Sequence, residues 1–150
     1  RLTGSSNNPI VYSEDYNYEI GKSIKIQDGN DVTIIATGTM VYESMKACEI
    51  LKTKNVNASL INMHTIKPLD YQAVLNATSK TKLIITVEEH SVYGGLGSSV
   101  SEVIAKEGVE NKVIVIGIED YYEKGGEYSY LKEKYGLNYN NIVSKILSNL

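Results

Sequence analysis

Apolar residues recur with two alternating periods along most of the chain, and this alternation predicts the order of its secondary structure. Short, mostly apolar runs, of the kind found in strands buried on both faces, occur four times. These runs are VTIIAT (32–37), ASLINM (58–63), LIITV (83–87) and VIVIGI (113–118). After each run the pattern changes, so strands and helices are expected to alternate.

Helical spacing of apolar residues follows each of the four runs. The first set is Val41, Met45, Cys48 and Leu51; the second is Ala73, Val74 and Ala77; the third is Leu96, Val100, Val103 and Ile104; the last is Ile142, Val143, Ile146, Leu147 and Leu150. Asp70 is a suitable N-cap for the second helix, and Gly108 can terminate the third.

The chain before the first run predicts one further strand. SIKIQ (23–27) alternates polar and apolar residues, and DGN (28–30) is a turn signal, so SIKIQ and VTIIAT are expected to form an antiparallel pair. Together these elements predict an α/β fold: a three-layer sandwich of a mostly parallel five-stranded sheet with one antiparallel strand and helices on both faces.

Length and charge narrow the class of protein. The 150 residues suit one domain, and a composition of 42% hydrophobic and 22% charged residues is typical of a globular protein. A net charge of −3 argues against nucleic-acid binding. The single cysteine, Cys48, cannot form an internal disulfide. No apolar run approaches the ~20 residues that span a bilayer, and nothing resembles a signal peptide, so a cytoplasmic location is expected.

Two strand ends carry residues that could bind a ligand, and for both a structural role is the stronger interpretation. ATGTM holds Gly38 and Thr39, but neither a G-x-G-x-x-G nor a P-loop motif is present, so a tight turn with an N-capping threonine is favoured. His64 and Lys67 of MHTIKPLD could contact an anion, but turn formation and capping by Asp70 already explain that spacing.

TVEEHSVYGGLGSSV (86–100) holds the ingredients of an acid/base site. Because successive side chains of an extended chain point to opposite faces, Glu88 and Glu89 should diverge, as should Glu89 and His90. The glycines permit a sharp turn, and Ser98 or Ser99 can cap the next helix. Two distant histidines and scattered acids make no metal site. The residues alone therefore predict no catalytic, cofactor-binding or metal-binding residue in this chain.

Four segments taken together resemble the C-terminal domain of the transketolase family over about residues 9–150. They are DVTIIATGTMVYESMKACEIL, NMHTIKPLD, TVEEHSVYGGLGSSVSEVIA and IGIEDYYEKGGEYSYLKEKYGL. The likeness is greatest to the separately encoded C-terminal subunit of split transketolases. Deoxyxylulose-phosphate synthases and 2-oxo acid dehydrogenase β subunits share the domain, but more often have another residue in place of His90.

This resemblance implies a part of a larger, thiamine diphosphate-dependent enzyme. In that family the cofactor and its Mg²⁺ lie between a diphosphate-binding and a pyrimidine-binding domain, across a dimer interface, so neither is expected in this chain. Residues 1–20 would be a linker from the pyrimidine-binding domain, and residues 21–150 the C-terminal domain, inactive alone. The candidates for contact with those domains are Glu88, Glu89, His90, Gly94, Gly95 and Gly97.

Two other functions stay open. One is a docking module in a deoxyxylulose-phosphate synthase or in a 2-oxo acid dehydrogenase β subunit, where this domain helps to bind the acyltransferase core. The other is a small-molecule binding domain that uses the strand ends near Gly38 and Gly94. The segment 119–136 is acidic, aromatic and broken by Gly125 and Gly126, so it is either a solvated connection or a lid.

Overall fold

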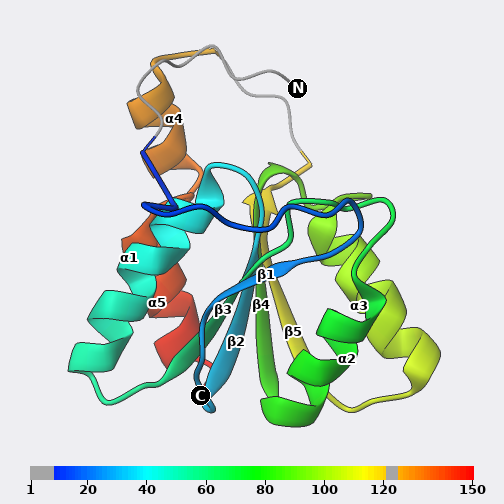
Figure 1. Cartoon of the computed structure of the whole chain (residues 1–150). Helices are drawn as coiled ribbons and strands as arrows, with labels where there is room; N and C mark the ends of the chain where they lie inside the picture. Colours follow the sequence, from blue (N-terminus) through cyan, green and yellow to red (C-terminus); the bar gives the residue numbers. More distant parts are fainter. Residues whose placement is uncertain (1–8, 121–124) are drawn as a thin grey trace.

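The computed structural model describes residues 9–120 and 125–150, which form the expected three-layer α/β sandwich (Figure 1). A five-stranded sheet has the order β1-β3-β2-β4-β5. Helices α1 and α5 cover one face, and α2 and α3 cover the other (Figure 1). The strands are β1 (Ile24–Gln27), β2 (Val32–Ala36), β3 (Ala58–Asn62), β4 (Leu83–Ser91) and β5 (Lys112–Ile118). The helices are α1 (Met40–Thr53), α2 (Tyr71–Lys80), α3 (Leu96–Glu107), α4 (Tyr128–Lys134) and α5 (Tyr139–Leu147).

Alternate residues of the central strands supply two hydrophobic cores. Ile34 of β2 packs in the core beneath α1 and α5, whereas Ile35 packs in the core beneath α2 and α3. Every residue of β2 and of β3 is buried, which is why both read as continuous apolar runs rather than as alternating ones. Burying a side chain of this size stabilises the fold by about 1.5–3 kcal/mol.

The expected pairing of β1 with the next strand is wrong, although β1 is antiparallel as expected. It pairs with β3, opposing Lys25 to Ile61. Both edges of β2 are occupied, because β3 and β4 each pair with it in parallel over five residue pairs. The DGN turn packs instead on the start of β3: a Cβ on Gly29 would lie 2.3 Å from the Ala58 carbonyl carbon, and Asp31 N donates to Asn57 O at 3.0 Å.

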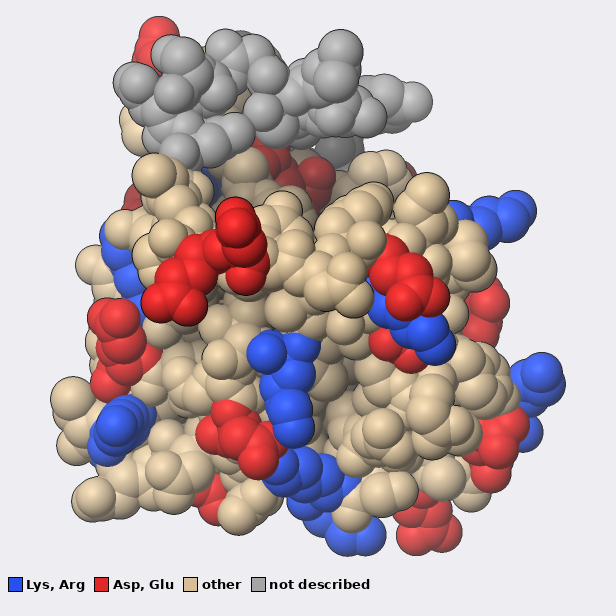
Figure 2. All heavy atoms as spheres, in the orientation of Figure 1, with Lys and Arg blue, Asp and Glu red and all other residues tan. Residues whose placement is uncertain are grey.

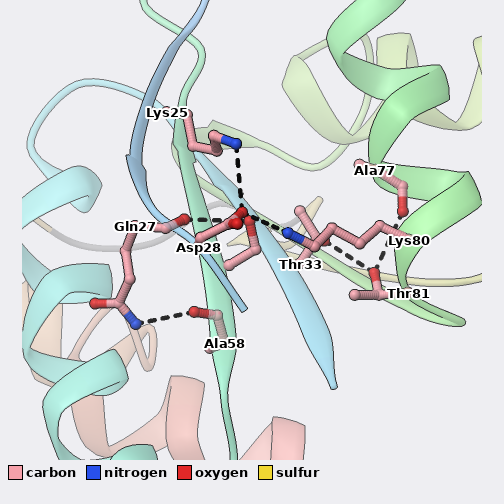
Figure 3. Close-up of polar contacts among 9 residues, drawn as sticks. Lys25, Gln27, Asp28, Thr33, Ala58, Ala77, Lys80 and Thr81 are labelled. Carbon is pink, nitrogen blue, oxygen red and sulfur yellow. Dashed lines mark hydrogen bonds and ion pairs between the residues drawn. The ribbon is translucent and has the colours of Figure 1, made fainter. Parts of the chain in front are cut away.

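Polar contacts at the carboxyl end of β1 attach this short edge strand to its neighbours (Figure 3). Asp28 lies between Lys25 and Lys80, and its carboxylate is paired with both ammonium groups. Gln27 Nε2 donates to Ala58 O at 2.9 Å. Hydrogen bonds from Lys80 and Lys25 hold the pKa of Asp28 below its usual value. The contact with Lys80 links the end of β1 to the last turn of α2.

Helix ends confirm two sequence predictions and add one helix. Asp70 accepts a hydrogen bond from Ala73 N at the start of α2, and Gly108 ends α3 with a φ of 65°. Helix α4, within the segment expected as a connection or a lid, was not predicted. It is only seven residues long and has no buried residue, so the sequence carries no apolar period there. Residues 121–124 of the segment lie outside the described residues.

The carboxyl ends of the parallel strands lie at one end of the domain, which we call the strand-end face: residues 9–22, 37–39, 63–69, 88–95 and 125–132. Residues 9–23 run across it (Figure 1). Tyr12 OH accepts a hydrogen bond from Asn62 at 2.7 Å, and the ring of Tyr18 lies 4.5 Å from that of His64. The expected linker, residues 1–20, is therefore in contact with the domain over its described part; residues 1–8 lie outside the described residues.

Among the described residues no helix is long and apolar enough to cross a membrane. The cysteine is buried in the α1 core, as expected, and burial raises the pKa of the Cys48 thiol to about 12.

Asp70→Asn should destabilise the domain by about 1 kcal/mol at pH 7, because the carboxylate accepts from Ala73 N and from both the amide and hydroxyl of Ser23. Burial opposes ionisation, but these hydrogen bonds outweigh it and hold the pKa of Asp70 below its usual value. Its contribution is therefore present above the unfolded-state pKa of about 3.9 and is lost as pH falls through the lower folded-state pKa.

Urea unfolding of wild type and variant across pH 2.5–7 checks this. The difference in unfolding free energy between wild type and Asp70→Asn should become smaller below pH ~4. Asp15→Asn, at an exposed position, is the control and should match wild type throughout. A difference in unfolding free energy between wild type and Asp70→Asn that stays constant with pH would contradict the role given to the Asp70 charge.

Candidate functional site

Glu88, near the end of β4, is fully buried, with 0% of its surface exposed. Its two carboxylate oxygens accept hydrogen bonds from Leu96 N at 2.7 Å and Gly97 N at 2.8 Å. These are amides of the first turn of α3, which have no partner within the helix. The positive end of the helix dipole favours a negative charge at this position. Glu88 is therefore the cap of α3, and neither Ser98 nor Ser99 takes that role.

The glycines of the β4–α3 loop make this contact possible. A Cβ on Gly95 would lie 2.0 Å from Glu88 Oε2, and one on Gly97 would lie 2.5 Å from Val115 Cγ1. Gly94 has a φ of 74°, in the left-handed region that favours glycine. The loop resembles a phosphate-binding loop in sequence, but its backbone lies close to the Glu88 carboxylate of the same chain.

Glu89 points away from Glu88, as the alternation of an extended chain predicts. Glu89 Oε2 accepts from Thr39 Oγ1 at 2.7 Å and from Tyr128 OH at 2.9 Å. Burial and the neighbouring carboxylate together raise the pKa of Tyr128, although a hydrogen bond with Thr39 opposes them. Glu89 thus links the ends of β2 and β4 to α4.

Thr39 occupies the N-cap position of α1 but makes no capping hydrogen bond with its side chain. The expected N-capping role is therefore wrong, because the hydroxyl donates to Glu89 instead. The turn before it was predicted correctly: Gly38 has a φ of 59°.

The remaining candidates do not join the glutamates in a catalytic group. His90 is exposed, and its Nδ1 lies 3.1 Å from Ser91 O. His64 is covered by Tyr18, with Nδ1 2.9 Å from Thr65 Oγ1. Lys67 lies exposed in the loop before α2. Over residues 9–120 and 125–150, no three His, Cys, Asp or Glu side chains are grouped so that they could hold a metal ion.

A cavity of about 260 Å³ opens at the strand-end face. It lies where the chain order reverses: β2 connects through α1 to β3 on one side, and the chain then crosses to β4 on the other. This topological switch point is the usual ligand position in open α/β sheets. The described residues that line it are Thr37, Gly38, Thr39, Ile66, Glu88, Glu89, His90, Gly94 and Gly95, with two carboxylates and neither Lys nor Arg among them.

The fold and this geometry define a doubly wound α/β domain whose strand-end carboxylates hold its own helices. The family described as "Transketolase, C-terminal domain" matches residues 21–142, and the chain belongs to this family. A protein of Methanocaldococcus jannaschii named as a transketolase C-terminal section is 40% identical over 143 residues, which cover 94% of this chain and 44% of that protein.

Two further relatives differ in the enzyme they come from. A 1-deoxy-D-xylulose-5-phosphate synthase of Heliobacterium modesticaldum is 39% identical over 124 residues, 83% of this chain and 19% of that protein. A solved structure titled "Split gene transketolase, inactive beta4 tetramer" superposes with a TM-score of 0.85 and 34% identity, covering 93% of this chain and 45% of that one. The chain thus spans less than half the length of the relatives that it matches.

Gly95→Ala should destabilise the domain by about 1–3 kcal/mol, because its Cβ would have to displace the buried Glu88 carboxylate from the first turn of α3. Gly125→Ala is the control, since a Cβ there meets no atom within 4 Å, and it should change the stability by less than about 0.5 kcal/mol. Urea unfolding gives both values. Equal stability of the two variants would show that the close approach at Gly95 is unimportant.

Proposed function

We propose that this chain is the C-terminal domain of a thiamine diphosphate-dependent transketolase, which transfers two-carbon ketol units between sugar phosphates, and that the domain alone is inactive. The family match and the likeness to a transketolase C-terminal section support this proposal. In this role the domain is a scaffold for the diphosphate-binding and pyrimidine-binding domains of the enzyme, and the whole enzyme is a homodimer or a higher oligomer.

The observation that carries the scaffold role is that the strand-end carboxylates are already bound within the domain. Glu88 caps α3, and Glu89 accepts from Thr39 and Tyr128. A general acid or base must reach a substrate proton, and the fully buried Glu88 does not.

The cavity does not fit thiamine diphosphate with its Mg²⁺. A diphosphate needs cationic groups or free amides, whereas the lining of this cavity in residues 9–120 and 125–150 has two carboxylates and neither Lys nor Arg. The amides of the first turn of α3 are already bonded to Glu88. We therefore assign the cofactor to the other domains and derive no catalytic step through it here.

The interdomain contacts that the sequence suggested divide into two groups. Glu89, His90 and Gly94 line the strand-end cavity and are proposed to contact the other domains directly. Glu88, Gly95 and Gly97 are buried, although Glu88 and Gly95 also border the cavity, and their proposed part is to fix the shape of the loop.

A deoxyxylulose-phosphate synthase is the second candidate for the parent enzyme. The similarity to the Heliobacterium synthase, 39% identical, favours it about as strongly as the 40% identity to the Methanocaldococcus section favours a transketolase. The histidine at position 90 favours transketolase. The two enzymes differ in the donor of the two-carbon unit, which is a ketose phosphate or a 2-oxo acid.

An assay of the chain alone and together with the remaining domains of its enzyme tests the proposal. The chain alone should give no turnover, and the assembled enzyme with thiamine diphosphate and Mg²⁺ should transfer a ketol unit from a ketose phosphate to an aldose phosphate. The remaining domains alone are the control. Turnover only with a 2-oxo acid donor would replace transketolase by the second candidate. Binding of thiamine diphosphate to this chain tighter than about 100 μM, roughly 5.5 kcal/mol, would contradict the scaffold role.

A further inference from the structure

A second cavity, of about 180 Å³, lies between α2 and the edge of the sheet formed by β1 and β3. Among the described residues it has no lining residue in common with the strand-end cavity. Small side chains leave this space between the two layers unfilled: Ala73 and Ala77 line it from α2, and Ser59 lines it from β3. The domain thus has a second, polar cavity that its strand-end site does not include.

The mouth of this cavity carries more positive than negative charge. Lys25, Asp28 and Lys80 line it, with side chains 61%, 64% and 32% exposed, and no other charged residue of the described chain does so. Asp28 Oδ1 accepts from both ammonium groups (Figure 3). Since an ammonium group has three donors, each lysine has two left for a further partner. Figure 2 shows basic side chains beside acidic ones in the lower middle of the visible face, where β1 and the end of α2 lie.

The hydroxyl groups of the lining present acceptors rather than donors to the cavity. Ser23 Oγ donates to Asp70 Oδ2 at 2.9 Å, and Ser59 Oγ donates to a backbone carbonyl of β1 at 3.2 Å. The Thr33 hydroxyl donates to Thr81 Oγ1 at 2.9 Å, because Thr81 donates its own proton to backbone carbonyl groups. Each lining oxygen keeps a lone pair but no proton, so the group that matches it is a hydroxyl donor.

We propose that this cavity binds a small polyhydroxylated anion, such as a polyol phosphate or a sugar acid. Lys25 and Lys80 hold the anionic group at the mouth. In the interior, Thr33 and Ser59, which are 1% and 3% exposed, accept hydrogen bonds from hydroxyl groups of the ligand. The site is formed by this domain alone, so it does not depend on which enzyme the chain belongs to.

The volume and the charges decide against other occupants. About 180 Å³ is below the ~300–1,000 Å³ of sites for drug-sized ligands, so the ligand has few carbon atoms. Two ammonium groups repel a cation, and an apolar molecule gives the hydroxyl oxygens no donor. Asp70 lies behind Ser23, and its negative charge favours a hydroxyl donor over an anion at that end. The anionic group is therefore placed at the two lysines.

Three substitutions test the two halves of the site. Lys80→Gln removes one ammonium group, and Lys52→Gln is its control, because Lys52 is an exposed residue in the last turn of α1, as Lys80 is in the last turn of α2. Ser59→Ala removes one acceptor, with the exposed Ser79→Ala as its control. Asp28→Asn removes the carboxylate that competes with the ligand for both lysines.

NMR titration of the isotope-labelled chain with glycerol 3-phosphate at low ionic strength gives both the affinity and the position of binding. The amide signals of residues 23, 33, 59 and 76 should shift. Glycerate replaces the phosphate by a carboxylate, and the tighter of the two ligands identifies the anionic group. Inorganic phosphate and glycerol, which each match one half of the site, should bind at least about fivefold more weakly than glycerol 3-phosphate.

Each variant has its own expected effect on these affinities. Lys80→Gln should weaken binding of glycerol 3-phosphate at least about fivefold, whereas Asp28→Asn should strengthen it at least about twofold. Ser59→Ala should weaken binding of glycerol 3-phosphate but not of inorganic phosphate, because only the polyol contacts that oxygen. Both control variants should bind like wild type, and circular dichroism verifies that every variant is folded.

Four results would overturn the proposal. The first is no binding of glycerol 3-phosphate at about 10 mM. The second is Lys80→Gln that binds like Lys52→Gln. Inorganic phosphate that binds as tightly as glycerol 3-phosphate would remove the polyol from the site. Signal changes confined to the surroundings of Lys67 and Lys106 would place the anion at α3 instead. All four measure binding rather than turnover, so failure of ketol transfer in the assembled enzyme would leave them unchanged.

Discussion

The buried carboxylate of Glu88 is the interaction on which the strand-end face depends. It is covered from solvent and could not be retained there without strong partners, because an unpaired charge in the interior costs several kcal/mol. The partners are two amides that α3 cannot satisfy by itself. The carboxylate gives the two buried amides an acceptor, and the amides give the buried carboxylate two donors, so neither side is left without a hydrogen bond. Strand β4, the glycine loop and α3 are fixed relative to one another by this contact.

Other helices of the domain are held in the same way. Glu43 is 5% exposed and accepts from Tyr139 N, at the start of α5, and from Lys132 Nζ of α4 at 2.7 Å. Asp70 accepts from α2 and from Ser23 of the segment before β1. In both cases a carboxylate accepts from an amide at a helix N-terminus, a position where other proteins bind a phosphate. The domain has the shape of a nucleotide-binding fold, but its own carboxylates lie at the N-termini of α2, α3 and α5, and shape alone indicates no nucleotide ligand.

The layers, the parallel strands, the cap at Asp70 and the end of α3 at Gly108 could be predicted, because each depends on residues close in sequence. Two features could not. Strand β1 pairs with β3 because β3 and β4 occupy both edges of β2. This outcome depends on the arrangement of the whole sheet. The cap of α3 comes from a residue eight positions earlier, and periodicity predicts only that Glu88 faces away from Glu89. The signal available was GGLG after a strand ending in glutamates, which marks a close approach without saying to what.

These two glutamates show how one sequence motif supplies two separate structural contacts. Glu88 is buried, and the amides of the first turn of α3 stabilise its carboxylate. Glu89, on the opposite side of the strand, accepts hydrogen bonds from the hydroxyl groups of Thr39 and Tyr128, which orient its carboxylate. One strand end thus fixes α3 through Glu88 and links α4 to the start of α1 through Glu89.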